Sequence, residues 1–269
     1  MAASAPIPRM RDMEVTFLGT GTSHGIPVIG CGCAVCRSTD PRDKRLRTAI
    51  HIRTPSLSLA VDTTPDFRAQ CLRENITRLD AVLYTHSHVD HILGFDDLRR
   101  FCELEKKEMP VFGSAATLEN LRRVFQYAFD GSAKFPNYVR PAPREIGGPF
   151  ELGGLRIVPV ELPHGRMVTN GFVFEQNGRR MFAYFTDCAG IPPEAEEAAR
   201  GAEVLVIDAL RHDAHSTHFT VQGAIEASRR IAPCKTYFIH MCHELGHAET
   251  EASMPDGIQL AYDGLRLDF

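Results

Sequence analysis

Short apolar runs separated by glycine, proline and charged residues recur along the chain and predict its strands. The runs are rich in β-branched and aromatic residues and cover residues 13–18, 47–54, 57–61, 79–84, 111–112, 155–160, 180–185, 204–208 and 235–239. Apolar residues at helical spacing predict helices at 67–74, 92–104, 115–129 and 221–231. Residues 257–269 are expected to form a closing strand pair.

The run 79–84 is followed directly by a cluster of potential metal ligands. Thr85 is followed by His86, His88, Asp90 and His91. In an extended segment His86 and His88 point to the same side, because side chains two positions apart share a face. Asp90 and His91 fall where the next helix begins and approach the same space from another side. Imidazole and carboxylate ligands suit zinc, manganese or iron, and four of them this close could seat two ions.

A second group of potential metal ligands lies nearer the N-terminus. Cys31, Cys33 and Cys36 are spaced closely enough to bind one zinc ion, with a fourth ligand from elsewhere in the chain. A chance cluster of buried thiols is the alternative. In a reducing compartment, clustered thiols indicate metal ligands before disulfides.

Composition narrows the class of protein. Of the 269 residues, 43% are hydrophobic and 24% are charged, and the net charge of -4 gives no sign of general nucleic-acid or membrane affinity. The cations at positions 42, 44, 45 and 47 are expected to form a solvated loop rather than an anion-binding patch. No apolar stretch approaches the ~20 residues that span a membrane, and the N-terminus lacks the apolar core of a secretory signal. We therefore expect one cytoplasmic domain over residues 1–269, with residues 1–12 as a flexible tail.

The sequence from His86 to His91 resembles the signature of the metallo-β-lactamase superfamily. The resemblance implies an α/β fold, the four-layer αββα sandwich, with a dinuclear metal site at one edge. Leu-Gly-Thr-Gly at 18–21 is similar to the opening of the phosphodiesterases of this superfamily. The Cys-x-Cys-x-x-Cys cluster resembles that of the PhnP-like phosphodiesterases, which hydrolyse a cyclic ribose phosphate and carry a structural zinc in a small loop.

The resemblance also implies the remaining ligands. His164 lies in a Pro-His-Gly turn after a predicted strand and is the expected next ligand, while His240 completes the site. In the family, the aspartate at the position of Asp187 bridges the two metals. Asp62 is expected to lie behind the ligands and support them. The implied division is His86, His88 and His164 on one ion and Asp90, His91 and His240 on the other, with Asp187 and a water between them.

The fourth ligand of the structural zinc is implied in the same way. PhnP-like proteins resemble this chain in pairing a histidine at the position of His243 with the three cysteines. Cys242 is a rival for that role.

A polar loop after the strand at 204–208 contains the candidate general acids. His218 directly precedes a predicted helix and resembles the His-x-Thr of phosphodiesterase branches, so we favour it, with His215 second. Asp90, His218 and His215 are the candidate catalytic residues. Residues 129–148 are rich in proline, glycine and basic residues, so we expect a loop over the site that selects the substrate.

These features predict a metal-dependent phosphodiesterase. It would hydrolyse a small phosphodiester, such as a cyclic ribose phosphate, through a hydroxide shared by two divalent ions, manganese or zinc, beside one structural zinc. An RNA-processing nuclease of the same fold is an alternative, opposed by the lack of a basic arm. A thioester or lactam hydrolase and a non-enzymatic metal-binding protein are the others. We expect a small-molecule substrate, no membrane or nucleic-acid partner, and leave a homodimer open because relatives are dimers.

Overall fold

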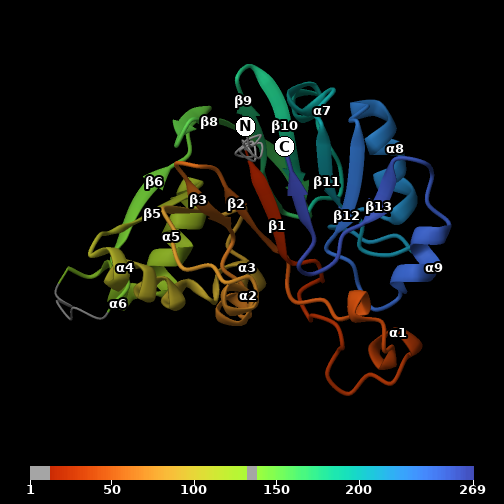
Figure 1. The fold of residues 1–269 in the computed structure, drawn as a ribbon, viewed down its shortest axis with the longest axis horizontal. Coiled ribbons are helices and arrows are strands. Elements are labelled where there is room, and N and C mark those ends of the chain that lie inside the picture. The colour runs from red at the N-terminus through yellow and green to blue at the C-terminus, as the bar shows by residue number, and fades with distance from the viewer. Residues whose placement is uncertain (1–12, 132–137) are drawn as a thin grey trace, which may run out of the picture.

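The computed structural model describes residues 13–131 and 138–269, which form two seven-stranded sheets packed face to face (Figure 1). The first sheet contains, in spatial order, β14 (Arg266–Asp268), β1 (Glu14–Gly19), β2 (Ala49–Arg53), β3 (Ser58–Val61), β4 (Ala81–Leu83), β5 (Met109–Gly113) and β6 (Pro141–Glu145). The second contains β13 (Ile258–Leu260), β12 (Lys235–Ile239), β11 (Val204–Asp208), β10 (Arg179–Phe185), β9 (Met167–Gln176), β8 (Leu155–His164) and β7 (Phe150–Leu152).

Helices cover the outer face of each sheet (Figure 1). On the first sheet these are α2 (Phe67–Arg73), α3 (Val89–Ile92), η2 (Phe95–Leu98), α4 (Arg99–Glu105), α5 (Ala115–Val124) and α6 (Gln126–Phe129). On the second they are α7 (Pro193–Ala199), α8 (Val221–Ile231) and α9 (His247–Ala252). The loop between β1 and β2 carries α1 (Ala34–Arg37) and the 3-10 turn η1 (Pro41–Asp43).

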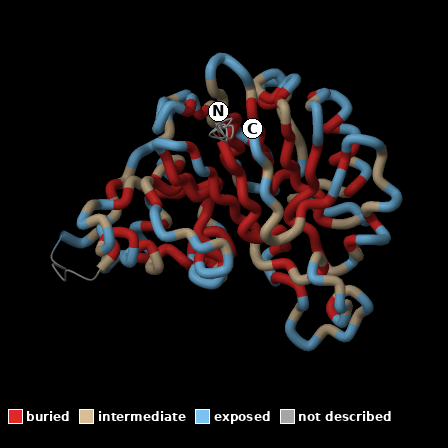
Figure 2. The backbone as a smooth tube through the Cα atoms, in the orientation of Figure 1, coloured by how far each residue is buried: buried red, intermediate tan, exposed pale blue. Residues whose placement is uncertain are grey.

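Three apolar layers result from the alternation of side chains along the strands. On β3, Leu59 and Val61 face the layer between the two sheets, whereas Ala60 faces the helices of the first sheet. The third layer lies between the second sheet and its helices. Figure 2 shows the buried backbone concentrated in the strands. The expected αββα sandwich is therefore confirmed.

Two predictions about the ends of the sheets are wrong. Residues 141–145, expected to be loop, form β6, which pairs with β5 at the edge of the first sheet. Its two prolines are tolerated because an edge strand needs only one side of its backbone for pairing. Residues 257–269 do not pair with each other: β13 joins β12 in the second sheet and β14 joins β1 in the first.

The strand pair that carries His164 is longer than expected. β8 continues to His164, which pairs with Met167, and the sequence did not predict its partner β9. Pro159 and Pro163 interrupt the strand pattern in this region and conceal its length. His164 is thus the last residue of a strand that is paired along its whole length.

Both long helices predicted on the first sheet are broken. Residues 92–104 divide into the end of α3, η2 and α4, while 115–129 divides at Phe125. At Gly94 the break follows from a close backbone approach: its N–H donates to the Thr63 carbonyl at 2.9 Å, and an added Cβ would lie 2.2 Å from the Thr64 carbonyl oxygen.

No helix within the described residues is both long and apolar enough to cross a membrane. The tail expected at residues 1–12 lies outside the described residues.

Gly94→Ala should destabilise the fold by about 1–3 kcal/mol, because the new methyl group must displace backbone that carries Thr63 and Thr64. Urea unfolding followed by circular dichroism would measure the loss. Gly147→Ala is the matched control, since an added Cβ there meets nothing within 4 Å. Equal stability of the two variants would contradict the close-approach explanation.

Candidate metal centre

Potential metal ligands from both sheets gather where several strands end. Asp90, His91, Asp187 and His240 are all buried, and their ligand atoms lie within 4.8 Å of one another. The Oδ2 atom of Asp187 lies 3.3 Å from Nε2 of His91 and 3.3 Å from Nε2 of His240. Two ligands at about 2.1 Å from a tetrahedral ion lie about 3.4 Å apart, so this spacing fits a shared metal.

A second group lies beside the first. His86, His88 and His164 also have ligand atoms within 4.8 Å of one another, with Nε2 of His164 3.3 Å from Nδ1 of His88. Nε2 of His86 lies 3.9 Å from the same Asp187 Oδ2 atom. Asp187 therefore lies between the two groups, where a bridging carboxylate is expected.

Hydrogen bonds on the far side of the imidazoles orient them. His91 donates from Nδ1 to Oδ2 of Asp62 at 2.7 Å. Thr85 donates its hydroxyl to the same oxygen at 2.8 Å and accepts from Nδ1 of His86 at 3.0 Å. His164 donates from Nδ1 to the Thr217 carbonyl at 2.8 Å. Each of these rings is held through Nδ1, which leaves Nε2 for a metal.

Three of the site's residues adopt the left-handed backbone region that side chains other than glycine resist. The φ angles are 67° at Asp62, 53° at Asp187 and 61° at His240, each just beyond the end of a strand. Such positions cost on the order of 1–3 kcal/mol each and persist where the surroundings enforce them. The strand ends are therefore bent sharply to bring these side chains together.

The pKa shifts differ between the two ligand groups. Burial lowers the pKa of His86 and of His164, so both rings are neutral and keep a lone pair. Around His91, burial is outweighed by the carboxylates of Asp187 and Asp62, which raise its pKa. The buried Nε2 atoms of His86 and His240 have no hydrogen-bond partner among the described residues. A divalent ion would satisfy these nitrogens, so the residues fit the group that the sequence predicts.

The two candidate general acids have different surroundings. Nδ1 of His218 lies 2.5 Å from Oδ2 of Asp208. The rings of His218 and His240 stack with their centroids 4.6 Å apart. His215 is exposed and accepts at Nδ1 from the Thr217 hydroxyl at 3.1 Å. His218 lines the cavity described next, whereas His215 does not.

A cavity of about 570 Å³ opens over the two ligand groups. Its lining residues are Ser23, Ser87, His88, Val89, Asp90, His164, Arg166, Met167, Asp187, Thr217, His218 and His240. None of the described residues in 129–131 and 138–148 is among them, so the prediction that this range covers the site is wrong for those residues. The range instead ends in β6, at the far edge of the first sheet (Figure 1).

Sequence reasoning missed Asp208 as a functional residue. Its side chain is fully buried, and Oδ2 also accepts from the Cys188 N–H at 3.1 Å. One carboxylate thus fixes both His218 and the backbone that follows Asp187. The available signal was an acidic residue at the end of an otherwise apolar strand, ten positions before His218.

The cysteine cluster forms a separate group of potential ligands. Nδ1 of His243 lies 3.3 Å, 3.5 Å and 3.7 Å from the sulfur atoms of Cys31, Cys33 and Cys36. Tetrahedral zinc with sulfur and nitrogen ligands places such atoms about 3.6 Å apart. The backbone N–H of Cys36, with the neighbouring thiols and His243, lowers the pKa of Cys33 to about 6, which favours the thiolate. Cys242 is not part of this group, and its sulfur accepts from the Glu244 N–H.

The basic residues at 42–47 were expected to form a solvated loop, and this prediction is wrong for Arg45. Arg45 is fully buried and donates to the carbonyls of Cys242 at 3.0 Å and Leu245 at 2.6 Å. These two carbonyls flank His243. Arg42 and Arg47 lie nearer the surface and pair with Asp40 and Asp66.

Comparison with known proteins agrees with this geometry. The family model described as the β-lactamase superfamily domain matches residues 58–241. An octanoyltransferase of Porphyromonas gingivalis is 34% identical over 94% of this chain, which spans only 51% of that protein. A ribonuclease Z of Bradyrhizobium diazoefficiens is 27% identical over 72% of this chain and 61% of its own length.

Among solved structures, a new diphosphatase from the PhnP family is similar over nearly the whole chain. It is 40% identical with a TM-score of 0.88, and the match covers 96% of this chain and 97% of that one. Since the family model also covers most of the chain, this protein belongs to the β-lactamase superfamily, in its PhnP-like branch, and is a metal-dependent hydrolase.

Proposed function

We propose that this chain hydrolyses small phosphodiesters with two divalent metal ions and His218 as the general acid. The observation that carries the proposal is the position of His218, which is held by Asp208 and lines the same cavity as Asp90 and Asp187. A thioester hydrolase has no need of a general acid at this point, because a thiolate leaves without protonation. The pairing thus favours a reaction in which an alkoxide leaves.

The two ligand groups would hold the ions. One group is His86, His88 and His164, the other is Asp90, His91 and His240, and Asp187 reaches both. Ions bound there supply Lewis-acid activation of water and offset charge on the phosphoryl oxygens. Five histidines with two carboxylates suit manganese as well as zinc, whereas three thiolates with His243 suit zinc.

The chain's own residues contribute orientation and proton transfer. Because Nδ1 of His218 contacts Asp208, its Nε2 is the atom left for the leaving oxygen of the substrate. His218 also lies within reach of His164 and Asp187, beside the position that the phosphoryl group would occupy. An in-line displacement would require the leaving oxygen to face Nε2 of His218.

Diphosphate hydrolysis is the second candidate, favoured by one comparison. The PhnP-family structure that is 40% identical is described as a diphosphatase. A phosphorus atom within a P–O–P diester has two non-bridging oxygens, as in a phosphodiester, so the same ligand groups and the same acid could serve both reactions.

The other enzymatic alternatives are less well supported. The similar ribonuclease Z acts on RNA by its name, but a net charge of -4 does not favour a polyanionic partner. The octanoyltransferase transfers an acyl group by its name, but this chain spans about half of that protein.

Turnover should be confined to phosphate esters and anhydrides in which phosphorus has two non-bridging oxygens. The manganese- or zinc-loaded protein would be assayed with bis(p-nitrophenyl) phosphate, p-nitrophenyl phosphate and a p-nitrophenyl thioester. Asp187→Ala is the control for metal-dependent turnover, since its carboxylate lies between the two ligand groups. Thioester turnover without diester turnover, at full metal content, would refute the proposal.

His218→Ala should lower kcat by roughly 10²–10⁴-fold for a diester with an alkoxide leaving group and much less for one that releases p-nitrophenolate, which needs little protonation. His215→Ala, which removes an exposed ring outside the cavity, should change both rates by less than about threefold. Metal content by mass spectrometry completes the test. Loss of a metal equivalent from His218→Ala would make His218 a ligand instead.

Cys31→Ser should remove one zinc equivalent per chain and lower the melting temperature by about 5 °C or more, because a structural ion contributes to folding. Cys234→Ser is the matched control, since Cys234 is an exposed thiol outside the group of four ligands. Unchanged zinc content and stability in Cys31→Ser would exclude the structural zinc. Zinc lost from Cys242→Ser but kept in His243→Ala would reverse the choice of the fourth ligand.

A further inference from the structure

Arg166 is the single lysine or arginine side chain among the described residues that line the cavity over the ligand groups. It lies in the turn between β8 and β9, two residues after His164. The remaining charged or ionisable groups of the lining are the candidate ligands and His218. Among the described lining residues, Arg166 is therefore the one permanent cation available to an anionic part of a ligand that extends beyond the proposed ions.

The guanidinium of Arg166 is also free to bind. Within residues 13–131 and 138–269, Arg166 is exposed and makes no ion pair or hydrogen bond. Arg47, whose Nε donates to the carbonyl of the cavity residue Ser23, is instead paired with Asp66 at 3.0 Å. An arginine left unpaired beside a cluster of histidines and carboxylates has no evident structural function.

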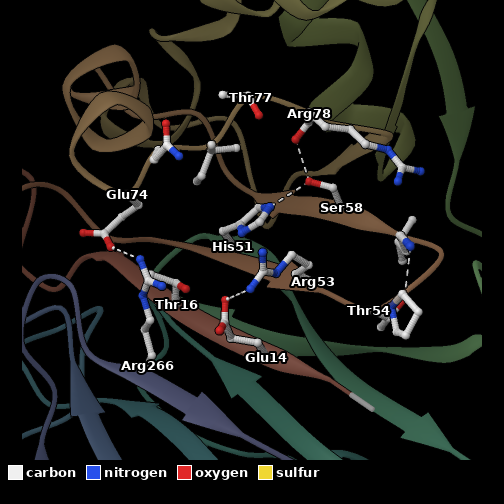
Figure 3. Close-up of a pocket in the computed structure, with 14 residues that line it drawn as sticks. Glu14, Thr16, His51, Arg53, Thr54, Ser58, Glu74, Thr77, Arg78 and Arg266 are labelled. Carbon is white, nitrogen blue, oxygen red and sulfur yellow. Dashed lines mark hydrogen bonds and ion pairs between the residues drawn. The ribbon is translucent and has the colours of Figure 1, made fainter. Parts of the chain in front are cut away.

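A second cavity, of about 320 Å³ on the outer face of the first sheet, provides the contrast (Figure 3). Its arginines are occupied: Arg53 pairs with Glu14 and Arg266 with Glu74, each at 3.1 Å, and Arg78 pairs with Asp80 at 2.8 Å. An anion would have to displace a carboxylate there. At Arg166 it would displace only water.

The turn holds Arg166 in a defined place relative to the ligand groups. His164 pairs with Met167, so Gly165 and Arg166 form a two-residue hairpin turn. Gly165 has a φ of 64°, and an added Cβ there would lie 2.6 Å from Cγ2 of Thr217, whose carbonyl accepts from His164. Thr217 therefore restrains both the ring of His164 and the turn that carries Arg166.

We propose that Arg166 binds a second phosphate group, directly linked to the phosphate that is attacked, so that the preferred substrates are diphosphate diesters. This inference rests on the proposed function, because it presumes that the first phosphate faces the two ligand groups. The planar guanidinium can donate two parallel hydrogen bonds to the oxygens of the second phosphate. We favour direct linkage because Arg166 lies in the two-residue turn that follows the ligand His164 and lines the same cavity.

The test compares binding of AMP with that of α,β-methylene-ADP, which carries a second, directly linked phosphate and cannot be hydrolysed at that link. Calorimetry with the manganese-loaded protein should show α,β-methylene-ADP binding roughly 10- to 100-fold more tightly than AMP. Arg166→Ala should reduce this preference to about threefold or less, and Arg166→Lys should keep part of it. Arg229→Ala, which removes an exposed arginine on α8 outside the cavity, should keep it all.

The kinetic readout uses two substrates. Arg166→Ala should lower kcat/KM for ADP-ribose at least about tenfold more than for bis(p-nitrophenyl) phosphate, which has one phosphate. Equal losses for both substrates would overturn the inference, because Arg166 would then act on the attacked phosphate. A preference for adenosine 3′,5′-bisphosphate over α,β-methylene-ADP would refute direct linkage. If neither substrate is hydrolysed but the binding preference depends on Arg166, the proposed function fails and the binding site stands.

Discussion

The carboxylate of Asp62 connects the segments on which the candidate metal centre depends. It is fully buried and accepts from His91, from the Thr85 N–H and from the Thr85 hydroxyl, which in turn accepts from His86. The strand ends of β3 and β4 and the short helix α3 are thereby fixed to one group. A buried carboxylate without these donors would cost several kcal/mol, so the network and the charge stabilise each other. His86 and His91 belong to different ligand groups, so Asp62 also sets how the two groups lie relative to one another.

The sheets explain why the ligands can stay so close together. Each candidate ligand loop leaves a strand that is paired on both sides, and left-handed residues turn the chain abruptly after β8, β10 and β12, at Gly165, Asp187 and His240. Clustered buried imidazoles and carboxylates are unfavourable by themselves, and the Nε2 atoms of His86 and His240 have no hydrogen bond within residues 13–131 and 138–269. The apolar layers on both sides of each sheet offset this cost. The paired strands and the apolar layers thus fix the backbone that carries the ligands.

The family resemblance implied the layered fold and the residues that gather at the site, but not the contacts that orient them. The spacing of His86 to His91 and the polar residues that follow apolar runs indicate metal ligands in the sequence itself. Asp208 was not predicted, because its partner His218 is brought near only when the chain turns back after β11. Arg166 was hidden for a similar reason: without β9, residue 166 reads as loop rather than as a hairpin turn beside His164. Arg45 was predicted to be solvated, since the two carbonyls to which it donates lie 197 and 200 positions away and have no signal in the sequence.

The cysteine group and the metal centre are mechanically connected through one short segment. His240 belongs to the centre and His243 faces the cysteines, and Met241 lies between them, with its N–H bonded to the Thr20 carbonyl and its carbonyl to the Thr22 N–H. Arg45 holds the carbonyl of the next residue, Cys242, from within the cysteine loop. A zinc ion bound to the cysteines would therefore restrain the segment on which His240 takes its left-handed conformation. The structural ion would stabilise the geometry of the reactive site as well as the loop that binds it.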